Sequence, residues 1–173
     1  MKLLKDILYG TRIQEITGST HVAIEDVAFD SRKVKAFSLF VAVPGTKVDG
    51  HDYIDQAIEN GAIAIVAERL PEEKKEGIAY IRVHDAAASL GPIAASYYDH
   101  PSASMKVIAV TGTNGKTTTV SLLYQLFRSM GRKTGMFSTV ENRILDQTIP
   151  ATHTTPDALQ MQRLFRDMAD AGC

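Results

Sequence analysis

A short apolar run followed at once by a glycine loop constrains this chain more than any other feature. Residues 106–110 read Lys-Val-Ile-Ala-Val, and the loop after them contains Gly112 and Gly115. A run of β-branched residues of this length is typical of a buried strand. We expect a strand over Lys106–Val110 and a long helix over Thr117–Met130. Strand, loop and helix in this order open a parallel α/β nucleotide-binding domain.

The loop has the residue types that hold the phosphates of a nucleotide. Two glycines allow a tight turn that brings backbone N–H groups against phosphate oxygens, and the helix start adds a partial positive charge. Lys116 is expected to reach the β- and γ-phosphates of ATP as the catalytic residue, and the Thr117 hydroxyl to hold Mg²⁺. The predicted cofactor-binding residues are Gly112, Thr113, Asn114, Gly115, Lys116, Thr117 and Thr118.

This loop departs from the general phosphate-loop pattern, which has a glycine where Val110 stands, so its first glycine is Gly112. A plainer interpretation is a glycine turn that caps a helix and is followed by a surface lysine. The three consecutive threonines from Thr117 to Thr119 argue against it, because β-branched residues are poor helix formers and suit a helix start where hydroxyl groups bind a ligand.

Composition excludes several classes of partner. The 173 residues carry 19 basic and 20 acidic side chains, for a net charge of -1, which favours neither nucleic acid nor a membrane surface. One cysteine, Cys173, allows no internal disulfide, and Met1–Gly10 lacks the apolar stretch of a signal peptide. We expect a cytoplasmic protein with no obligate protein partner.

The residues before the phosphate loop predict a small α/β domain of their own, residues 1–101. A short helix is expected at Leu3–Leu8, and a second, ended by Gly61, at Tyr53–Ile58. A third is expected at Ala86–Tyr98. The expected strands are Val22–Phe29, Leu39–Val43, Ala62–Val66 and Ala79–Val83.

Residues 102–173 predict the first part of a second α/β domain. After the long helix we expect a strand at Thr134–Phe137, an irregular stretch containing Pro150, and a helix over Pro156–Ala171. A parallel sheet buried on both faces needs more strands than the two predicted between Lys106 and Cys173. This domain is therefore expected to be incomplete.

The run Val110–Thr119 resembles the ATP loop of the Mur ligase superfamily, which includes folylpolyglutamate and cyanophycin synthetases. Asp30-Ser31-Arg32 and Asp49–Ile54 resemble the N-terminal domain of the Mur ligases. The resemblance implies that this domain holds the uridine diphosphate end of the substrate, with Ser31 at the diphosphate or ribose. Thr46, Lys47 and Val48 would then form the loop around uracil. Taken alone, these stretches would indicate polar turns and a helix N-cap.

Thr152–Asp157, which reads Thr-His-Thr-Thr-Pro-Asp, is similar to the Mur ligases that extend UDP-N-acetylmuramoyl-L-alanyl-D-glutamate. The resemblance implies that Thr154 and Thr155 hold the muramoyl or peptide part of that substrate, with His153 as a further contact. As structure, the same residues predict a helix start with Thr155 as N-cap and Pro156 as first residue. The chain departs from the family at Ala36-Phe37-Ser38, where Pro-Gly-Asp is common.

The resemblance implies ATP-dependent amide bond formation in peptidoglycan precursor synthesis. A substrate carboxylate would attack the γ-phosphate to give an acyl phosphate, which the amine of meso-diaminopimelate or L-lysine would then attack. The two anions require Mg²⁺, Lys116 and backbone N–H groups rather than a protein nucleophile. The family's later metal-binding residues and C-terminal domain have no counterpart in this sequence, so we expect no ligase activity from this chain alone.

Two other functions stay open at this point. The ligase that adds D-alanyl-D-alanine to UDP-N-acetylmuramoyl-tripeptide shares the N-terminal pattern, although Thr154–Asp157 and Asn114 argue against it. A non-catalytic nucleotide-binding regulator could carry the same phosphate loop. It would bind ATP without affinity for UDP-muramoyl peptides.

Overall fold

The computed structural model describes residues 1–45, 48–150 and 157–173. The backbone divides into two compact units, Met1–Tyr97 and Tyr98–Cys173, and each is described by itself. Both combine helices with sheets, and the first contains parallel strands, so the expected α/β class is confirmed.

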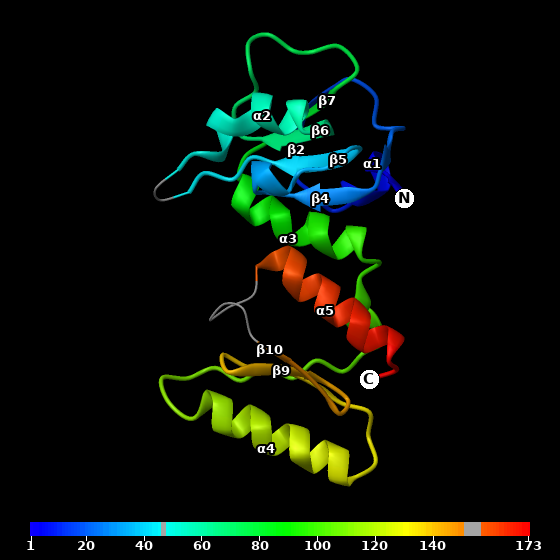
Figure 1. Cartoon of the computed structure of the whole chain (residues 1–173), viewed down its shortest axis with the longest axis vertical. Coiled ribbons are helices and arrows are strands. Elements are labelled where there is room, and N and C mark those ends of the chain that lie inside the picture. Colours follow the sequence, from blue (N-terminus) through cyan, green and yellow to red (C-terminus); the bar gives the residue numbers. More distant parts are fainter. Residues whose placement is uncertain (46–47, 151–156) are drawn as a thin grey trace. The chain divides into compact units, whose positions relative to one another are not determined.

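A five-stranded sheet forms the first unit, in the order β2-β7-β6-β5-β4 (Figure 1). Strands β4 to β7 run parallel, and β2 pairs antiparallel with β7 at one edge. The strands are β2 (Ile13–Thr17), β4 (Asp26–Ala28), β5 (Ser38–Val41), β6 (Ala62–Ala67) and β7 (Ala79–Val83). A separate short pair joins β1 (Lys2–Leu3) to β3 (Ala23–Ile24).

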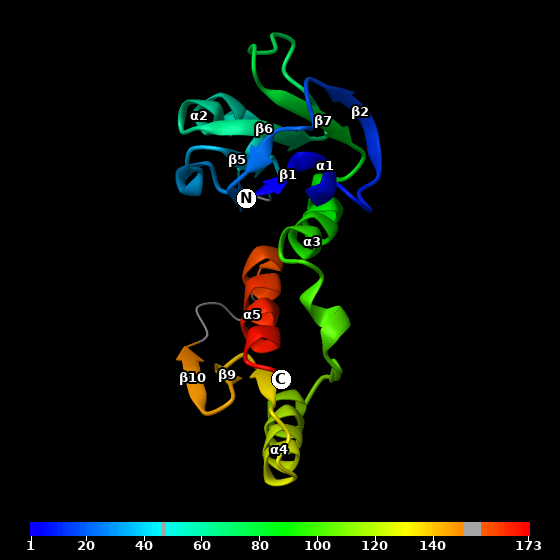
Figure 2. The ribbon, with the colours of Figure 1, turned by 90° about the vertical axis from the view of Figure 1, so that its right-hand side faces the viewer.

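Helices cover both faces of this sheet, with α2 on one side and α3 on the other (Figures 1 and 2). Phe40, Ile65 and Tyr80 face a cluster that includes Ile54 and Ala57 of α2. The alternate strand residues Leu39, Val41, Ala64, Val66 and Ile81 are completely buried as well, which is the pattern of a sheet covered on both faces. The helices are α1 (Leu4–Ile7), η1 (Ser31–Lys33), η2 (Gly50–Tyr53), α2 (Ile54–Glu59) and α3 (Ala86–Tyr97).

Most elements expected in residues 1–101 are confirmed, but strands β1 and β2 were not predicted and one predicted strand is divided. The run Val22–Phe29 forms two strands that choose different partners, because β3 pairs with β1 whereas β4 pairs with β5. The change of partner occurs at Glu25, whose N–H donates to the carbonyl of Phe37, 3.0 Å away.

The second unit combines a three-stranded antiparallel sheet, in the order β10-β9-β8, with two long helices. Tyr124 of α4 donates a hydrogen bond to the carbonyl of Leu145 and lies under the guanidinium of Arg143, 5.5 Å from ring centre to Cζ. Phe137 of β8 meets Phe165 of α5 edge to face. The elements are η3 (Pro101–Ser104), α4 (Lys116–Ser129), β8 (Gly135–Phe137), β9 (Glu141–Ile144), β10 (Gln147–Pro150) and α5 (Ala158–Asp170).

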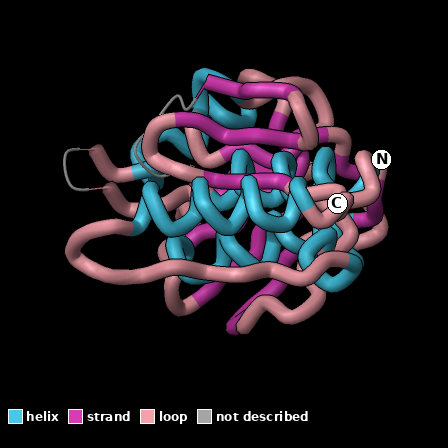
Figure 3. Tube along the Cα trace, turned by 90° about the horizontal axis from the view of Figure 1, so that it is seen from below, coloured by secondary structure: helices cyan, strands magenta, loops and turns pink. Residues whose placement is uncertain are grey.

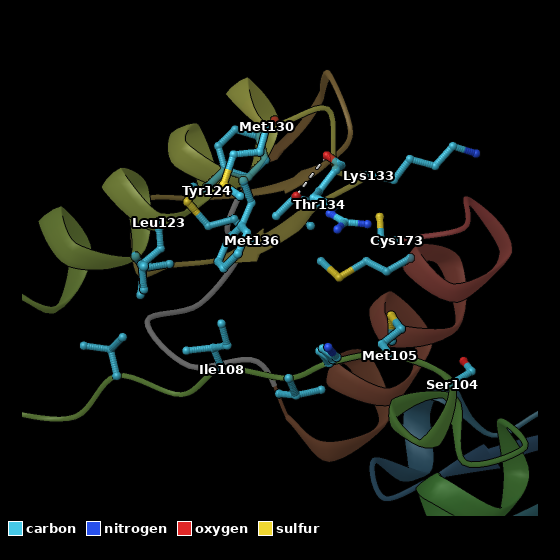
Figure 4. A pocket seen from close by; sticks show the side chains of 18 residues that line it. Ser104, Met105, Ile108, Leu123, Tyr124, Met130, Lys133, Thr134, Met136 and Cys173 are labelled. Atoms are coloured by element: carbon cyan, nitrogen blue, oxygen red, sulfur yellow. Dashed lines mark hydrogen bonds between the residues drawn. The ribbon is translucent and has the colours of Figure 1, made fainter.

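The strand predicted over Lys106–Val110 is wrong. This run is loop (Figure 3), and the side chains of Val107 and Ile108 are 54% and 57% exposed. A hollow of about 520 Å³ lies between the run and the residues of β8 and α4 (Figure 4). Ile108 lines it from one side, and Leu123 and Met136 from the other. Strand β8 is at the edge of the described three-stranded sheet, where it pairs with β9 and not with this run.

Two further expectations in this unit are corrected. The stretch that contains Pro150 is a hairpin of β9 and β10, which turns at Leu145 with φ +54°. The sequence lacks the asparagine-glycine pair that signals such a turn, so the hairpin was not predicted. Helix α5 begins at Ala158 with Asp157 as N-cap, whose carboxylate accepts from the Gln160 N–H at 2.8 Å. Thr155 and Pro156, which were predicted as N-cap and first helical residue, lie outside the described residues.

Candidate functional site

The carboxyl ends of parallel strands meet at one edge of the first sheet. Of the described residues, 29–33 follow β4, 42–45 and 48–50 follow β5, and 68–69 follow β6 at that edge. In open α/β sheets, ligands bind outside the carboxyl ends of the strands. The edge therefore collects the predicted uridine-diphosphate residues that the structure describes, Ser31 and Val48.

Ser31 is held on the first turn of η1, next to α2. Asp30 caps this turn by accepting from the Arg32 N–H at 3.1 Å, and the Arg32 guanidinium lowers the pKa of the Asp30 carboxyl. The Ser31 hydroxyl donates to Gln56 Oε1 at 2.8 Å, and Asn60 donates to the Ser31 carbonyl at 2.9 Å. The Ser31 residue is only 7% exposed, so any ligand contact would use the remaining acceptor capacity of its hydroxyl.

The described residues of the loop after β5 are joined by backbone hydrogen bonds. The Gly45 N–H donates to the Val48 carbonyl at 3.0 Å, and the Gly50 N–H donates to the Val43 carbonyl at 3.1 Å. Val48 is 54% exposed. Thr46 and Lys47 lie outside the described residues, so their predicted contacts with uracil stay predictions.

The phosphate loop of the second unit has an open geometry at the start of α4. Gly112 and Gly115 have φ of +149° and +79°, which favour glycine. Gly115 is the N-cap of α4 and supplies no side chain to bond the first-turn N–H groups, so these donors are available to an anion. The Lys116 ammonium group donates to the carbonyls of Gly112 and Thr113. Thr113, Asn114 and Thr118 are exposed around it.

Thr139 is a residue of this site that the sequence interpretation missed. Its Oγ1 lies 3.5 Å from Oγ1 of Thr117, the predicted metal ligand. The preceding Ser138 orders the turn, because its hydroxyl accepts from the N–H groups of Val140 and Glu141 and donates to the Glu141 carbonyl. A signal was present in the sequence, since polar residues directly follow the strand predicted after the phosphate-loop helix.

The third predicted group, His153, Thr154 and Thr155, lies outside the described residues. Within the described ranges, no cluster of three or more histidine, cysteine, aspartate or glutamate side chains could hold a metal ion. No described helix is long and apolar enough to cross a membrane.

A phosphate loop at a helix start, preceded by a unit with a parallel sheet, is typical of α/β nucleotide-binding proteins. The Mur ligase family, catalytic domain, matches residues 23–98, and the Mur ligase middle domain matches residues 110–173. The chain therefore belongs to the Mur ligase family.

Within this family, two similar relatives carry the name UDP-N-acetylmuramoyl-L-alanyl-D-glutamate--2,6-diaminopimelate ligase. The one from Cytophaga hutchinsonii is 50% identical over 171 residues, which are 98% of this chain and 35% of that protein. The one from Bacteroides thetaiotaomicron is 47% identical over 99% of this chain and 36% of its own length. The chain thus spans about a third of the length of the curated relatives it matches.

Solved structures of Mur ligases are also similar to this chain. A structure of UDP-N-acetylmuramoyl-L-alanyl-D-glutamate--2,6-diaminopimelate ligase matches with a TM-score of 0.78 and 25% identity, over 99% of this chain and 34% of that chain. The MurF ligase from Thermotoga maritima, solved in complex with ADP, matches with a TM-score of 0.54 and 28% identity, over 82% of this chain and 29% of that chain.

Proposed function

We propose that this chain provides the UDP-substrate-binding and ATP-phosphate-binding parts of an ATP-dependent ligase in peptidoglycan precursor synthesis. The ligase would join 2,6-diaminopimelate to UDP-N-acetylmuramoyl-L-alanyl-D-glutamate. The observation that carries the proposal is the open phosphate loop with Lys116 at the start of α4. The names of relatives that are 47–50% identical over almost the whole chain support the choice of substrate and amino acid.

The residues of the phosphate loop fit ATP and Mg²⁺. The glycines leave backbone N–H groups open to phosphate oxygens, and the Lys116 ammonium would exchange its loop carbonyls for the β- and γ-phosphates. Thr117 would hold Mg²⁺ through its hydroxyl, and we assign Thr139 as the second hydroxyl beside it. Bound ATP would supply the phosphoryl group that activates the substrate carboxylate.

The chain's own residues would act by charge and position rather than as nucleophiles. A substrate carboxylate and a phosphate repel each other, and Lys116 and the first-turn dipoles of α4 would offset that repulsion. In the first unit, Ser31, Thr46, Lys47 and Val48 would bind the uridine diphosphate end. His153, Thr154 and Thr155 would hold the muramoyl-peptide part. We propose a cytoplasmic location for the protein. We propose neither nucleic acid nor a membrane as its partner.

The alternative substrate, UDP-N-acetylmuramoyl-tripeptide with D-alanyl-D-alanine, is less favoured. The chain matches the diaminopimelate ligase structure with a TM-score of 0.78, against 0.55 for the D-alanyl-D-alanyl ligase from Acinetobacter baumannii and 0.54 for the MurF ligase from Thermotoga maritima. The structural likeness and the names of the relatives point the same way.

Ligand-dependent thermal shifts of the 173-residue chain test the proposal. We expect UDP-N-acetylmuramoyl-L-alanyl-D-glutamate to raise the melting temperature more than UDP or the corresponding tripeptide does. ATP with Mg²⁺ should also stabilise the chain, and Lys116→Ala should remove only that effect. Stabilisation by ATP alone would support the non-catalytic regulator, and a larger shift with the tripeptide would support the alternative ligase.

A phosphate-release assay tests the expectation that the chain alone has no ligase activity. The mixture contains the chain, ATP, Mg²⁺, UDP-N-acetylmuramoyl-L-alanyl-D-glutamate and 2,6-diaminopimelate. We expect no release above the rate without the amino acid. Substrate-dependent release that Lys116→Ala abolishes would contradict this expectation.

A further inference from the structure

Asp49, His51 and Arg69 form a polar clamp beside residues 43–45 and 48–50, the described parts of the loop after β5. We propose that His51 is a positioning residue, which holds these described residues in the arrangement that binds a nucleoside diphosphate. The inference rests on the proposed function, since it concerns the same end of the substrate. It concerns a residue to which the sequence assigned no role beyond a turn.

The His51 ring joins two segments that are distant in sequence. Its Nδ1 lies 2.6 Å from Asp49 Oδ1, and its own backbone N–H donates to the same oxygen at 3.0 Å. Its Nε2 accepts from the backbone N–H groups of Glu68 and Arg69 at 3.1 and 3.3 Å. Because Nε2 faces two donors, it must present its lone pair, and the ring proton is on Nδ1. The His51 side chain is 8% exposed.

Asp49 completes the clamp on the other side of the ring. Its second carboxylate oxygen accepts from the Arg69 guanidinium. The bonds from the backbone and ring of His51 lower the pKa of the Asp49 carboxyl, so it carries its charge. Glu68, whose N–H is one of the ring's donors, accepts from the Ala86 N–H at 2.9 Å and so connects the clamp to the start of α3. The loop is thereby fixed to the carboxyl end of β6.

The described backbone on either side of residues 46–47 is closely packed at two glycines. A Cβ at Gly45 would lie 2.6 Å from the Val48 carbonyl oxygen, and a Cβ at Gly50 would lie 2.6 Å from that of Val43. Neither glycine position therefore has room for a side chain. Val48, next to the clamp, is an exposed apolar residue.

The surroundings favour a nucleoside diphosphate as the ligand. An exposed apolar side chain and close backbone polar groups suit a flat base with hydrogen-bonding edges. The same sheet edge carries the guanidinium groups of Arg32 and Arg69, each paired with a carboxylate and largely exposed, and arginine suits phosphate oxygens. His51 contacts none of these ligand groups itself, and acts through the loop.

Two substitutions separate the functions of the two ring nitrogens. In His51→Asn, the side-chain amide can replace Nδ1 towards Asp49 but cannot reach the N–H groups of Glu68 and Arg69. In His51→Gln, the longer side chain can place its carbonyl where Nε2 accepts. The matched control is His84→Gln, at an exposed histidine of the same unit. NMR of the ring nitrogens in the unchanged chain should show the Nδ1–H form of His51.

Amide exchange and UDP titration of the whole chain provide the deciding readouts. We expect His51→Asn to speed exchange of the Gly45 and Gly50 amides about tenfold or more, and to weaken UDP binding by a similar factor. His51→Gln should recover part of both effects, and His84→Gln should change neither. Exchange within β5 and the response to ATP with Mg²⁺ should be the same in all variants, which separates positioning from general loss of stability.

The outcomes distinguish this inference from the proposed function. Unchanged exchange at Gly45 and Gly50 in His51→Asn, or an Nε2–H ring, would overturn the clamp. Faster exchange with unchanged UDP affinity would overturn its role in ligand binding. If the unchanged chain does not bind UDP, the proposed substrate is wrong, and the ligand-positioning role of His51 is wrong as well. The exchange rates of the Gly45 and Gly50 amides would still show whether His51 holds the backbone in place.

Discussion

Phe37 has a left-handed backbone conformation, with φ +60°, and is half-exposed. The Mur ligases that the sequence resembles often have glycine at this place, within Pro-Gly-Asp. The turn before β5 is therefore retained here with a residue that is strained in it, since the left-handed region costs a non-glycine residue about 1–2 kcal/mol. Its carbonyl still accepts from the Glu25 N–H, so the strain does not displace the turn.

The two substitutions Phe37→Gly and Phe37→Ala measure this strain. Both remove the ring, but only glycine relieves the backbone, so we expect Phe37→Gly to be more stable than Phe37→Ala by about 1 kcal/mol. Urea unfolding followed through amide resonances of the first unit would measure the difference. At Ala87, an exposed position within α3, Ala87→Gly should instead destabilise. A Phe37→Ala variant as stable as Phe37→Gly would contradict the strain.

Asp49 makes the stability of the first unit depend on pH. The bonds from His51 and Arg69 lower its pKa in the folded chain, whereas an unfolded aspartate has a pKa of about 3.9. The stability that this carboxylate contributes is therefore complete above the unfolded pKa and is lost as the pH falls through the lower, folded pKa.

Asp49→Asn should therefore make the free energy of unfolding less dependent on pH under acidic conditions. We expect the free energy of unfolding to fall less between about pH 5 and pH 2 in Asp49→Asn than in the unchanged chain. Asp52→Asn, at an exposed carboxylate of the same turn, is the control and should leave the curve as it is. If the free energy of unfolding falls equally with pH in the unchanged chain and in Asp49→Asn, the pKa of Asp49 is not lowered in the folded chain.

At the scale of elements, the start of α4 and the turn after β8 meet at two hydroxyl groups. Thr117 and Thr139 are 22 residues apart in sequence, and their Oγ1 atoms are 3.5 Å apart. If Thr139 supports the Mg²⁺ site, Thr139→Val should weaken binding of ATP with Mg²⁺ by about fivefold, because the loss of one hydrogen bond costs about 1 kcal/mol. Calorimetric titration would measure it.

Thr148→Val, an exposed residue of β10, is the matched control and should bind ATP with Mg²⁺ as the unchanged chain does. A second titration without Mg²⁺ identifies the cause, because the difference between Thr139→Val and the unchanged chain should then become smaller. Equal affinities in the presence of Mg²⁺ would remove Thr139 from the site.

The elements differ in how far the sequence predicted them. Strands β5, β6 and β7 were predicted because continuous apolar runs bounded by polar turns have few alternatives. Helix α4 was predicted from the glycine loop before it. The hairpin β9–β10 was not, because its residues are polar and its turn uses Leu145 in a glycine-like conformation. The run Lys106–Val110 has the composition of a strand, but a strand also needs neighbours.

At the scale of the whole molecule, the two units differ in how well they bury their apolar residues. The first covers both faces of its sheet, whereas the second leaves Val107 and Ile108 exposed beside a hollow. Burial of apolar surface is the main favourable term in folding, and local openings occur where buried contacts are few.

Hydrogen exchange should therefore differ strongly along the chain. We expect the amides of β5 and β6 to exchange slowly and those of residues 106–111, which lie in no helix or strand, to exchange at nearly the unfolded rate. Mass spectrometry of peptides from the intact chain would measure both. Strong protection of residues 106–111 in the absence of ligand would contradict this description of the second unit.

The sequence by itself determined the local features of this protein: the apolar runs that form strands, the glycine loop at a helix start, and the stretches that resemble a Mur ligase. These depend on residues close together in the chain. Only the tertiary structure decided which groups meet across it. It pairs β3 and β4 with different strands, brings Thr139 to Thr117, and turns His51 towards the N–H groups of Glu68 and Arg69. Each of these contacts depends on a partner distant in sequence, whose position is set by the packing of the sheet and helices rather than by local composition.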